Sequence, residues 1–550
     1  MNYKAEYERW LALADDADIK SELEMMDETA IEDAFYRDLA FGTGGLRGTI
    51  GAGTNRMNVF VVAKASQGLA NYLGSGASVV IGYDSRIKSD MFARTAASVF
   101  AANGLTVHLW PTLNPVPTVS FAVRYLKASQ GVMITASHNP SKYNGYKVYG
   151  PDGCQITTEA ASKILAEITK LDIFADVKSM DFDRAVAEGK IQYIKDSVLT
   201  AFIEEVKGQS VLFGDEVNRD VAIVYSPLNG TGLIPVTRAL SESGFTNITV
   251  VEEQREPDGN FPTCPYPNPE IREAMELGLQ YCRKTGADLL LATDPDADRC
   301  GIAVRNGNDY QLLSGNEVGI LLLNYICSQR IKHNRMPDHP VFIKTIVTMD
   351  LAEKIAAHYN VQTINVLTGF KFIGEQIGVL ESHGRISDYI CGFEESYGYL
   401  TGSYVRDKDA VNAAFMICEM FAFYKTQGIS LLEKLNELYA LYGYCLNTLH
   451  SYEFPGSAGM QKMSEIMHTF HAGLDTVGGE TVIKTEDYSQ GLNGLPKSDV
   501  LKYYTESGSV VIRPSGTEPK LKAYISVTAA NKEAAEAVEQ RISADLEKLL

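Results

Sequence analysis

The sequence has 550 residues, of which 45% are hydrophobic and 22% charged, as in a typical soluble globular protein. This length exceeds what one hydrophobic core supports, and we expect four domains. The formal net charge of −19 argues against a nucleic-acid or anionic-membrane partner, and no apolar run approaches the roughly 20 residues that span a bilayer. The eight cysteines form no C-x-x-C pair, which favours reduced thiols in a cytosol. We therefore expect a cytoplasmic protein, whose oligomeric state the sequence leaves open.

The chain opens with an amphipathic pattern, which predicts a helix and lacks the apolar core of a secretory signal. Residues 42–48, GTGGLRG, form a glycine-rich segment soon afterwards. This segment lacks the Lys-Ser/Thr of a Walker A loop and does not fit G-x-G-x-x-G, so a nucleotide site is a poor interpretation. A loop that presents Arg47 to an anion fits better, and a plain surface loop is the alternative.

Three stretches of the chain share one pattern: an apolar strand, a turn, a helix-period segment and a second strand. They begin at Ser78, Val221 and Val341. This pattern is the unit of parallel α/β sheets. Because the stretches resemble one another in pattern more than in residues, we expect three related α/β domains, with one large α/β sheet as the alternative.

Ser137 follows the apolar run GVMIT, which predicts a strand that ends in an exposed loop. A serine hydroxyl is a poor nucleophile unless a base activates it or it already carries the group to be transferred, and no G-x-S-x-G elbow surrounds Ser137. The segment TASHNP (135–140) could equally be a turn whose side chains bond their own backbone. Lys147 lies ten residues further on, near enough to return to the same place, although an isolated lysine is more often solvated.

Asp294, Asp296 and Asp298 follow the buried-looking strand ADLLLAT, in the segment DPDADR. Three carboxylates at this spacing repel one another and therefore predict a hard divalent cation with oxygen ligands, for which Mg²⁺ is the natural occupant. Arg299 adjoins them and adds a planar donor for a phosphate oxygen. A solvated acidic turn is the alternative, and an EF-hand does not fit because its central glycine and distal glutamate are missing.

The character of the chain changes from about residue 446, where a polar stretch, an alternating strand pair and a closing helix at 532–550 predict a smaller α+β unit. The turn between the paired strands reads RPSGTEP (513–519), which predicts an anion cradle, with a plain β-turn as the alternative. Before this unit, the segment GFEESYG (392–398) carries paired acids and a serine at a strand exit. Such residues suit the recognition of sugar hydroxyls, although this signal is weak alone.

Together and in this order, these motifs resemble the α-D-phosphohexomutase superfamily, which contains the phosphoglucomutases and phosphomannomutases. The resemblance spans nearly the whole chain, from Gly42 to Pro519. It implies three related α/β domains with mixed sheets and a C-terminal α+β domain around a central active-site cleft. We expect these domains at residues 1–205, 206–317, 318–445 and 446–550.

The resemblance also implies roles for individual residues. Ser137 is similar to the phosphorylated serine, and with the three aspartates it would bind Mg²⁺. Arg47, Lys147 and Arg299 occupy the places of further catalytic residues, near the nucleophile or the transferring phosphoryl group. The implied substrate-binding residues are Lys344, Lys371, Glu394, Ser396, Arg513, Ser515, Gly516 and Thr517.

The implied reaction interconverts glucose 1-phosphate and glucose 6-phosphate through a phosphoserine enzyme and glucose 1,6-bisphosphate, which also serves as activator. Two segments resemble the branch that contains glucose and pentose phosphate mutases and a glucose bisphosphate synthase. They are GFEESYG (392–398), here called the sugar loop, and TGFK (368–371), where phosphomannomutase-type members have TGH. Phosphomannomutase, phosphopentomutase or bisphosphate synthase activity remains open. A phosphosugar-binding regulatory protein is the non-enzymatic alternative, against which Ser137 and the intact aspartate triad argue.

Overall fold

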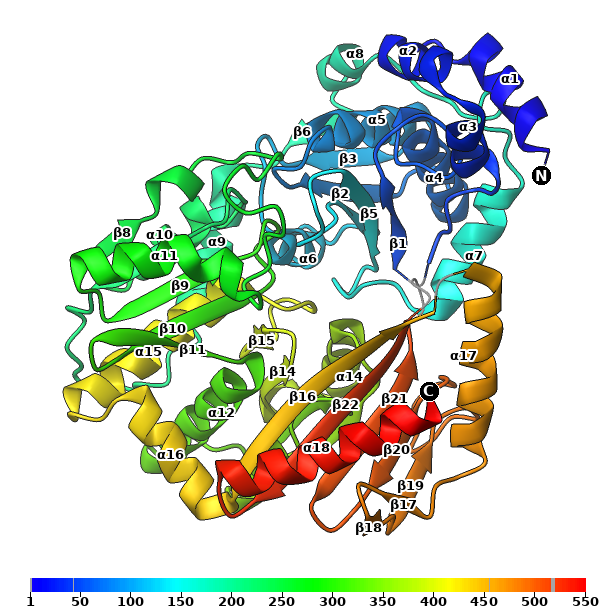
Figure 1. Ribbon diagram of the computed structural model, residues 1–550. Helices are drawn as coiled ribbons and strands as arrows, with labels where there is room; N and C mark the ends of the chain where they lie inside the picture. The colour runs from blue at the N-terminus through cyan, green and yellow to red at the C-terminus, as the bar shows by residue number, and fades with distance from the viewer. Residues whose placement is uncertain (1, 43, 455, 516–519) are drawn as a thin grey trace. The chain divides into compact units, whose positions relative to one another are not determined.

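The computed structural model of the protein describes residues 2–42, 44–454, 456–515 and 520–550 (Figure 1). The chain forms two compact units. The first unit comprises Met1–Ser314, Gly374–Tyr389 and Tyr397–Phe423, and the second comprises Gly315–Ile373, Ile390–Ser396 and Tyr424–Leu550. None of the helices in these described ranges is both long and apolar enough to cross a membrane.

The first unit opens with three helices, α1 (Tyr3–Leu13), α2 (Ala17–Met25) and α3 (Glu28–Phe35), of which α1 confirms the predicted N-terminal helix. Their N-caps are Asn2, Asp16 and Asp27, and each cap side chain accepts a backbone N–H of its helix. The buried Trp10 of α1 makes an edge-on contact with Phe35, at a ring-centroid distance of 5.6 Å. An aromatic contact therefore joins α1 to α3.

A mixed six-stranded sheet follows, in the order β1-β5-β4-β2-β3-β6. Its strands are β1 (Gly45–Thr49), β2 (Ser78–Tyr83), β3 (Thr106–Leu109), β4 (Gln130–Ile134), β5 (Tyr143–Tyr149) and β6 (Ile191–Tyr193). The accompanying helices are α4 (Val59–Leu73), α5 (Ser89–Ala102), α6 (Val116–Tyr125), α7 (Thr158–Thr169), α8 (Phe182–Ala187) and α9 (Asp196–Lys207). Strands β2, β3, β4 and β6 pair in parallel, whereas β5 runs antiparallel to both β4 and β1. The unit β2–α5–β3 confirms the pattern that begins at Ser78.

The second sheet of the first unit has five strands in the order β11-β10-β9-β7-β8. Its elements are β7 (Ile223–Ser226), α10 (Leu233–Glu242), β8 (Ile248–Val250), η1 (Glu252–Gln254), α11 (Arg272–Thr285), β9 (Leu289–Thr293), β10 (Cys300–Asn306) and β11 (Asp309–Leu313). Strand β7 pairs in parallel with β8 and β9, and β10 runs antiparallel to β9. The unit β7–α10–β8 confirms the second predicted pattern.

The third predicted pattern is the unit β12–α13–β13, in which β12 and β13 pair in parallel. Strands β13, β12 and β14 are neighbours in that order. The elements of this part of the chain are α12 (Gly315–Lys332), β12 (Val341–Thr345), α13 (Leu351–His358), β13 (Gln362–Val366), α14 (Phe370–Ser382), η2 (Ile386–Asp388), β14 (Tyr389–Glu394), β15 (Gly398–Leu400), α15 (Ala410–Thr426) and α16 (Leu431–Tyr442).

The C-terminal part is a twisted antiparallel sheet in the order β16-β22-β21-β20-β19, with α18 packed on β16 and β22. Its elements are β16 (Tyr444–Glu453), α17 (Gly456–His471), β17 (Thr476–Val477), β18 (Glu480–Thr481), β19 (Lys484–Asp487), β20 (Leu501–Tyr504), β21 (Gly508–Pro514), β22 (Lys520–Ala529) and α18 (Lys532–Leu549). The paired strands β21 and β22 and the closing helix confirm the predicted α+β character.

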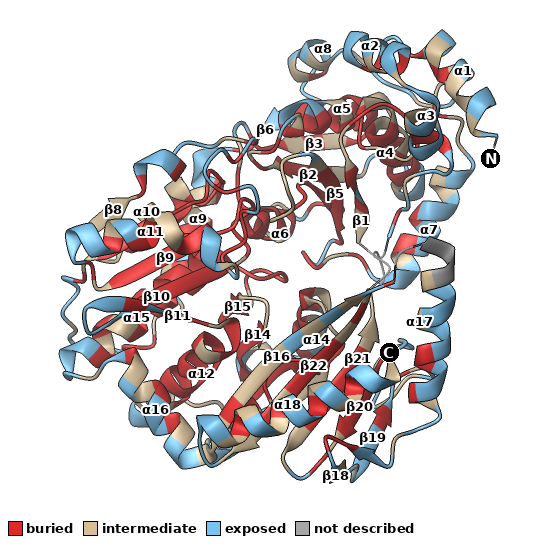
Figure 2. Cartoon of the chain, in the orientation of Figure 1, coloured by how far each residue is buried: buried red, intermediate tan, exposed pale blue. Residues whose placement is uncertain are grey.

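The interior strands of the sheets are mostly buried, as Figure 2 shows. Every residue of β4, β9 and β12 is buried. Loops that leave the carboxyl ends of such strands are the usual place for ligands in α/β proteins. Ser137, Asp294 and the segment after Lys344 all follow strands of this kind. The α/β fold class is confirmed, whereas the boundaries of the four domains stay a prediction.

Candidate active site

Ser137 lies in the loop that follows β4. Its backbone has a φ of 53°, in the left-handed region that residues other than glycine rarely adopt. Its N–H donates to Thr135 Oγ1 at 2.8 Å. Only 4% of the residue is exposed, so the expectation of an exposed loop is wrong. The reason is that the loop folds around a buried arginine.

That arginine is Arg86, which follows β2 and has no exposed side-chain surface. Asp84 lies 3.4 Å from Arg86 Nε and supplies a compensating charge. The guanidinium donates to carbonyl oxygens of the loop, those of Ser137, Asn139, Pro140 and Tyr143. Sequence patterns indicated no role for Arg86, because a single arginine after a strand carries no signal of a buried partner.

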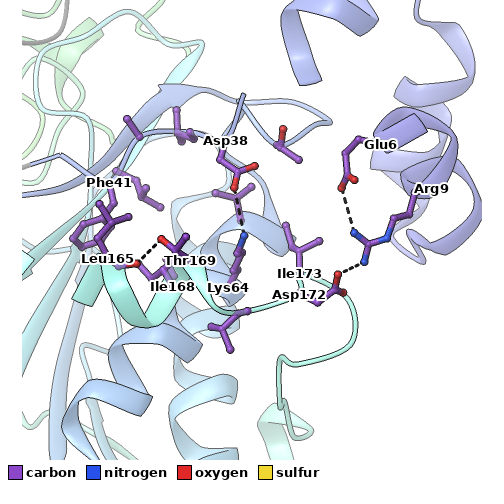
Figure 3. Close-up of a pocket in the computed structure, with 17 residues that line it drawn as sticks. Glu6, Arg9, Asp38, Phe41, Lys64, Leu165, Ile168, Thr169, Asp172 and Ile173 are labelled. Carbon is purple, nitrogen blue, oxygen red and sulfur yellow. Dashed lines mark hydrogen bonds and ion pairs between the residues drawn. The ribbon is translucent and has the colours of Figure 1, made fainter. Parts of the chain in front are cut away.

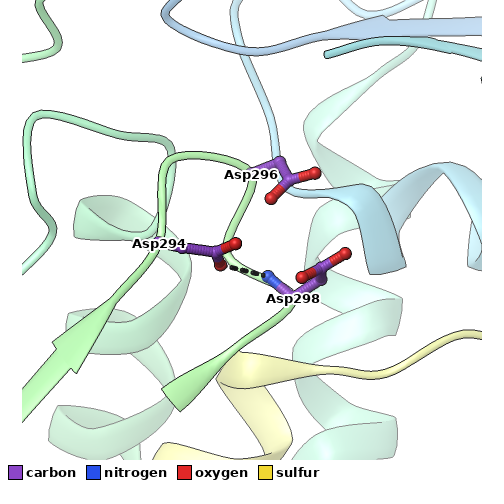
Figure 4. A group of neighbouring side chains, drawn as sticks. All are labelled: Asp294, Asp296 and Asp298. Atoms are coloured by element: carbon purple, nitrogen blue, oxygen red, sulfur yellow. Dashed lines mark hydrogen bonds between the residues drawn. The ribbon is translucent and has the colours of Figure 1, made fainter. Parts of the chain in front are cut away.

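The three aspartates lie in the tight loop between the antiparallel strands β9 and β10 (Figure 4). Ala297, at the tip, adopts the left-handed conformation with a φ of 47°. Asp294 Oδ1 accepts the backbone N–H groups of Asp298 at 3.0 Å and Arg299 at 2.9 Å, which closes the loop. One carboxylate oxygen from each aspartate lies within 4.8 Å of the others, and all three side chains are buried. The loop thus gathers three oxygen ligands in one place.

Ser137 belongs to the same cluster, because its Oγ donates to Asp294 Oδ2 at 2.9 Å. Asp296 Oδ1 and Asp298 Oδ1 are buried and accept no hydrogen bond from the described residues. Buried carboxylate oxygens without donors are costly unless a cation binds them. A set of four oxygen ligands, of which three are carboxylates, suits Mg²⁺. The residues present therefore fit the predicted metal.

Burial and the charges of Asp296 and Asp298 raise the pKa of Asp294 well above its usual range. Burial also acts to raise the pKa of Asp296, but Lys147 and Lys408 outweigh it and lower that pKa. The cluster thus concentrates negative charge that only nearby cations relieve.

Two lysines supply part of that positive charge. Lys147, on β5, lies 3.0 Å from Asp296 Oδ2 and 3.4 Å from Asp298 Oδ2, and is buried rather than solvated. Burial acts to lower its pKa, but the two aspartates outweigh burial and raise it. Lys408 Nζ lies still closer, 2.7 Å from Asp298 Oδ2. Sequence reasoning missed Lys408; the available signal was the run RDKD (406–409), whose charges are all buried.

The other predicted catalytic residues lie around this cluster. Arg47, on β1, is exposed and donates to Asn139 Oδ1 at 3.3 Å, so it reaches the loop of the nucleophile. Arg299 forms an ion pair with Glu270, and its Nε lies 3.9 Å from Asp298 Oδ1.

His138 is a residue of the predicted motif to which no role was given. Its Nδ1 lies 3.1 Å from Ser137 Oγ. Burial, followed by the charges of Arg299 and Arg47, lowers its pKa well below the usual value. His138 therefore remains neutral beside the nucleophile and adds no positive charge to it.

Lys344, at the end of β12, belongs to the second unit and is completely buried. Its Nζ donates to the carbonyl of Thr348 at 3.0 Å and lies 3.1 Å from Glu353 Oε1. Asp350 is 3.8 Å away and also binds Lys502 Nζ at 2.8 Å. The structure thus places Lys344 in a buried ionic network.

The sugar-loop candidates follow β14 in the second unit. Glu394 is buried at the end of that strand, and Ser396 lies half-buried in the turn beyond it. Arg513, on β21, interacts with Tyr524 of β22. Burial and the charge of Glu395 raise the pKa of Tyr524 to about 12, against the opposing effect of Arg513. Tyr524 is a further residue that sequence reasoning missed, and charges from both predicted loops act on its pKa.

The remaining candidates divide between described and undescribed parts of the chain. Ser515 donates its N–H to the carbonyl of Lys520 at 2.7 Å. Gly516 and Thr517 lie outside the described residues. Lys371, in the first turn of α14, lies over the ring of Phe372 at 5.0 Å.

Family models match four consecutive segments of the chain. Three are described as phosphoglucomutase/phosphomannomutase, alpha/beta/alpha domains I, II and III, and match residues 38–173, 200–307 and 314–442. The fourth, the C-terminal domain of the same family, matches residues 461–544. These matches cover most of the chain in the order that the motifs predicted.

Curated relatives and solved structures agree with this assignment. The phosphoglucomutase of Staphylococcus saprophyticus is 38% identical over 95% of this chain and 96% of its own length, and that of Staphylococcus aureus USA300 is 36% identical over the same shares. Parafusin, a phosphoglucomutase from Paramecium, has the same fold in its open form, with a TM-score of 0.70, 18% identity and coverage of 94% of this chain and 95% of its own. A putative phosphomannomutase from Thermus thermophilus gives a TM-score of 0.68 at 22% identity, over 93% and 99% of the two chains. The chain belongs to the phosphoglucomutase/phosphomannomutase family.

Proposed function

We propose that this protein is a phosphoglucomutase that interconverts glucose 1-phosphate and glucose 6-phosphate, with Ser137 as its phosphoryl carrier. One observation carries the proposal: Ser137 Oγ contacts Asp294 Oδ2 at 2.9 Å inside a buried cluster of carboxylates with unpaired oxygens. The curated phosphoglucomutases at 34–38% identity over nearly the full chain support glucose as the sugar. In the proposed cycle, phosphorylated Ser137 transfers its phosphoryl group to the sugar phosphate, which becomes glucose 1,6-bisphosphate. The bisphosphate then returns its other phosphoryl group to Ser137.

Phosphoryl transfer depends mainly on positioning and on neutralising charge. Ser137 and the three aspartates would hold Mg²⁺, which when bound neutralises charge that develops on the phosphoryl oxygens. The chain's own residues hold the Ser137 loop in place. Arg86 binds the carbonyl oxygens of this loop, and the N–H of Ser137 donates to Thr135. Lys147 stays protonated because its pKa is raised, and it therefore stabilises anionic groups rather than accepting a proton. Arg47, and Arg299 once it leaves Glu270, would bind the phosphoryl oxygens.

We assign sugar and distal-phosphate binding to the second unit. Glu394 and Ser396 would hold sugar hydroxyls, and the carboxylate of Glu394 suits that role because it accepts hydrogen bonds. Arg513 and Ser515 would bind the phosphate that is not being transferred, together with Gly516 and Thr517. Lys344 and Lys371 are two further residues that would bind the substrate. The four domain boundaries, a cytoplasmic location, and a phosphosugar as the small-molecule partner belong to it as well.

The test is a coupled assay of glucose 6-phosphate formation from glucose 1-phosphate, with Mg²⁺ and glucose 1,6-bisphosphate supplied. Ser137→Ala should reduce kcat by at least about 10³-fold, since alanine has no hydroxyl to carry the phosphoryl group. Ser162→Ala, on the exposed face of α7, is the matched control and should keep full activity. Substantial mutase activity of Ser137→Ala would refute the assignment, and parallel assays with mannose 1-phosphate and ribose 1-phosphate measure the preference for glucose.

A further inference from the structure

A cavity of about 340 Å³ lies in the first unit, apart from the residues of the active site (Figure 3). Helices α1, α4 and α7, strand β1 and the segments 38–41 and 171–173 enclose it. Its volume falls within the range of small-molecule sites, which are mostly apolar with a few polar groups at defined places. Its interior is formed by Phe41, Leu46, Val61, Leu165, Ile168 and Ile173.

Charged side chains line one part of this cavity, and acids outnumber bases among them. Lys64 lies 3.5 Å from Asp38, and Arg9 forms ion pairs with both Asp172 and Glu6. The three carboxylates and two cations leave one negative charge in excess. An anionic ligand would meet this excess as repulsion, whereas a cation would neutralise it.

Strand β1 contributes one residue to the cavity and the next residue to the active site. Leu46 lines the cavity, while its neighbour Arg47 donates to Asn139 in the loop of the nucleophile. Successive residues of a strand point to opposite faces, so one strand separates the two places. α1 contributes Glu6 and Arg9, and it precedes the segment that the first family model matches, which starts at residue 38.

We propose that this cavity binds a small cationic amphiphile, a protonated amine on an apolar body, and that its occupancy acts on Arg47 through β1. At about 30 Å³ for each water-sized volume, the cavity holds a ligand of about ten non-hydrogen atoms. The amine is attracted by the excess negative charge of the lining, and the apolar body lies against Leu46 and the side chains of α7. The binding part of the proposal is independent of which sugar the enzyme uses.

The test uses octylamine, which is protonated at neutral pH, and titrates it into the full-length protein by calorimetry. 1-Octanol and octanoate are the neutral and anionic probes of the same chain length. Octylamine should bind more tightly than 1-octanol, and octanoate least of all. Glu6→Gln combined with Asp38→Asn should weaken octylamine binding by about tenfold and remove the discrimination against octanoate. Asp183→Asn combined with Glu188→Gln removes the same charge from α8 and its surroundings, and should leave binding unchanged.

A second variant fills the cavity without altering its charge. Ala65→Leu, on α4, should abolish binding of octylamine and 1-octanol alike. In the mutase assay octylamine should change kcat of the wild type and have no effect on Ala65→Leu. Failure of the wild type to bind octylamine saturably, equal binding of octanoate, or unchanged affinity in the Glu6→Gln, Asp38→Asn protein would overturn the proposal. Binding that leaves kcat and KM unchanged would overturn the role of β1, and a protein that binds octylamine but lacks mutase activity would instead refute the proposed function.

Discussion

Replacing Lys408 by methionine removes the closest cation to the buried Asp298, 2.7 Å away. At this distance an ion pair with an effective dielectric constant of 20 gains about 6 kcal/mol of gross Coulomb energy. Lys147 stays 3.4 Å from the same carboxylate and offsets part of the loss. Breaking a buried pair by removing one partner costs about 3–5 kcal/mol. We therefore expect Lys408→Met to lower the free energy of unfolding of the first unit by about 3 kcal/mol in the presence of a chelator.

Saturating Mg²⁺ should shrink this loss to below about 1 kcal/mol, because the bound cation replaces the missing positive charge. Urea unfolding followed by tryptophan fluorescence reports on the right part of the chain, since both tryptophans, Trp10 and Trp110, belong to the first unit. Lys163→Met is the matched control, because Lys163 pairs with Glu159 at the same distance, 2.7 Å, on the exposed surface. The free energy of unfolding of Lys163→Met should equal that of the wild type within error. Equal destabilisation of Lys408→Met with and without Mg²⁺ would refute the reasoning that Lys408 and the metal neutralise one cluster.

Two further predictions concern the second unit. Burial acts to lower the pKa of His471, but hydrogen bonds to Asp499 and Asp487 outweigh it and raise this pKa. The stability that the two contacts contribute should therefore be complete below pH 6.5 and be lost as the pH rises through the pKa of His471 in the folded protein. Comparing urea unfolding of wild type and His471→Gln by circular dichroism across this range checks the sign, and a difference that grows with pH would contradict it. Lys502→Met removes the ammonium group that binds Asp350 and should lower the free energy of unfolding of the second unit by about 3 kcal/mol. Amide hydrogen exchange in β20 should accelerate in this variant. Unchanged exchange would show that the ion pair of Lys502 and Asp350 does not stabilise this strand.

The nucleophile loop and the aspartate triad could be predicted because each follows an apolar strand within a short motif. Each loop leaves the carboxyl end of a buried strand, β4 in the six-stranded sheet and β9 in the second sheet, and the order of the motifs indicated one family. The fold class followed from the same alternation of strands and helices. For these features local chemistry and topology point to the same place.

Contacts that depend on distant segments could not be predicted in this way. Lys408 reaches Asp298 from a segment more than a hundred residues away in the sequence, and no motif rule links them. Arg86 looked like an ordinary turn residue, although it holds the nucleophile loop. Arg299 pairs with Glu270, which has no sequence signal at all. Burial of a charge and its partner is a property of the packed chain.

The left-handed backbone at Ser137 limits which hydroxyl can serve as phosphoryl carrier. Threonine and serine are chemically equivalent acceptors, but a branched Cβ is strongly disfavoured at positive φ. Asparagine and aspartate tolerate that conformation, yet neither offers a hydroxyl. An exchange of serine for threonine, ordinarily a mild step between homologous proteins, is thus closed at this position by the main chain and not by the reaction.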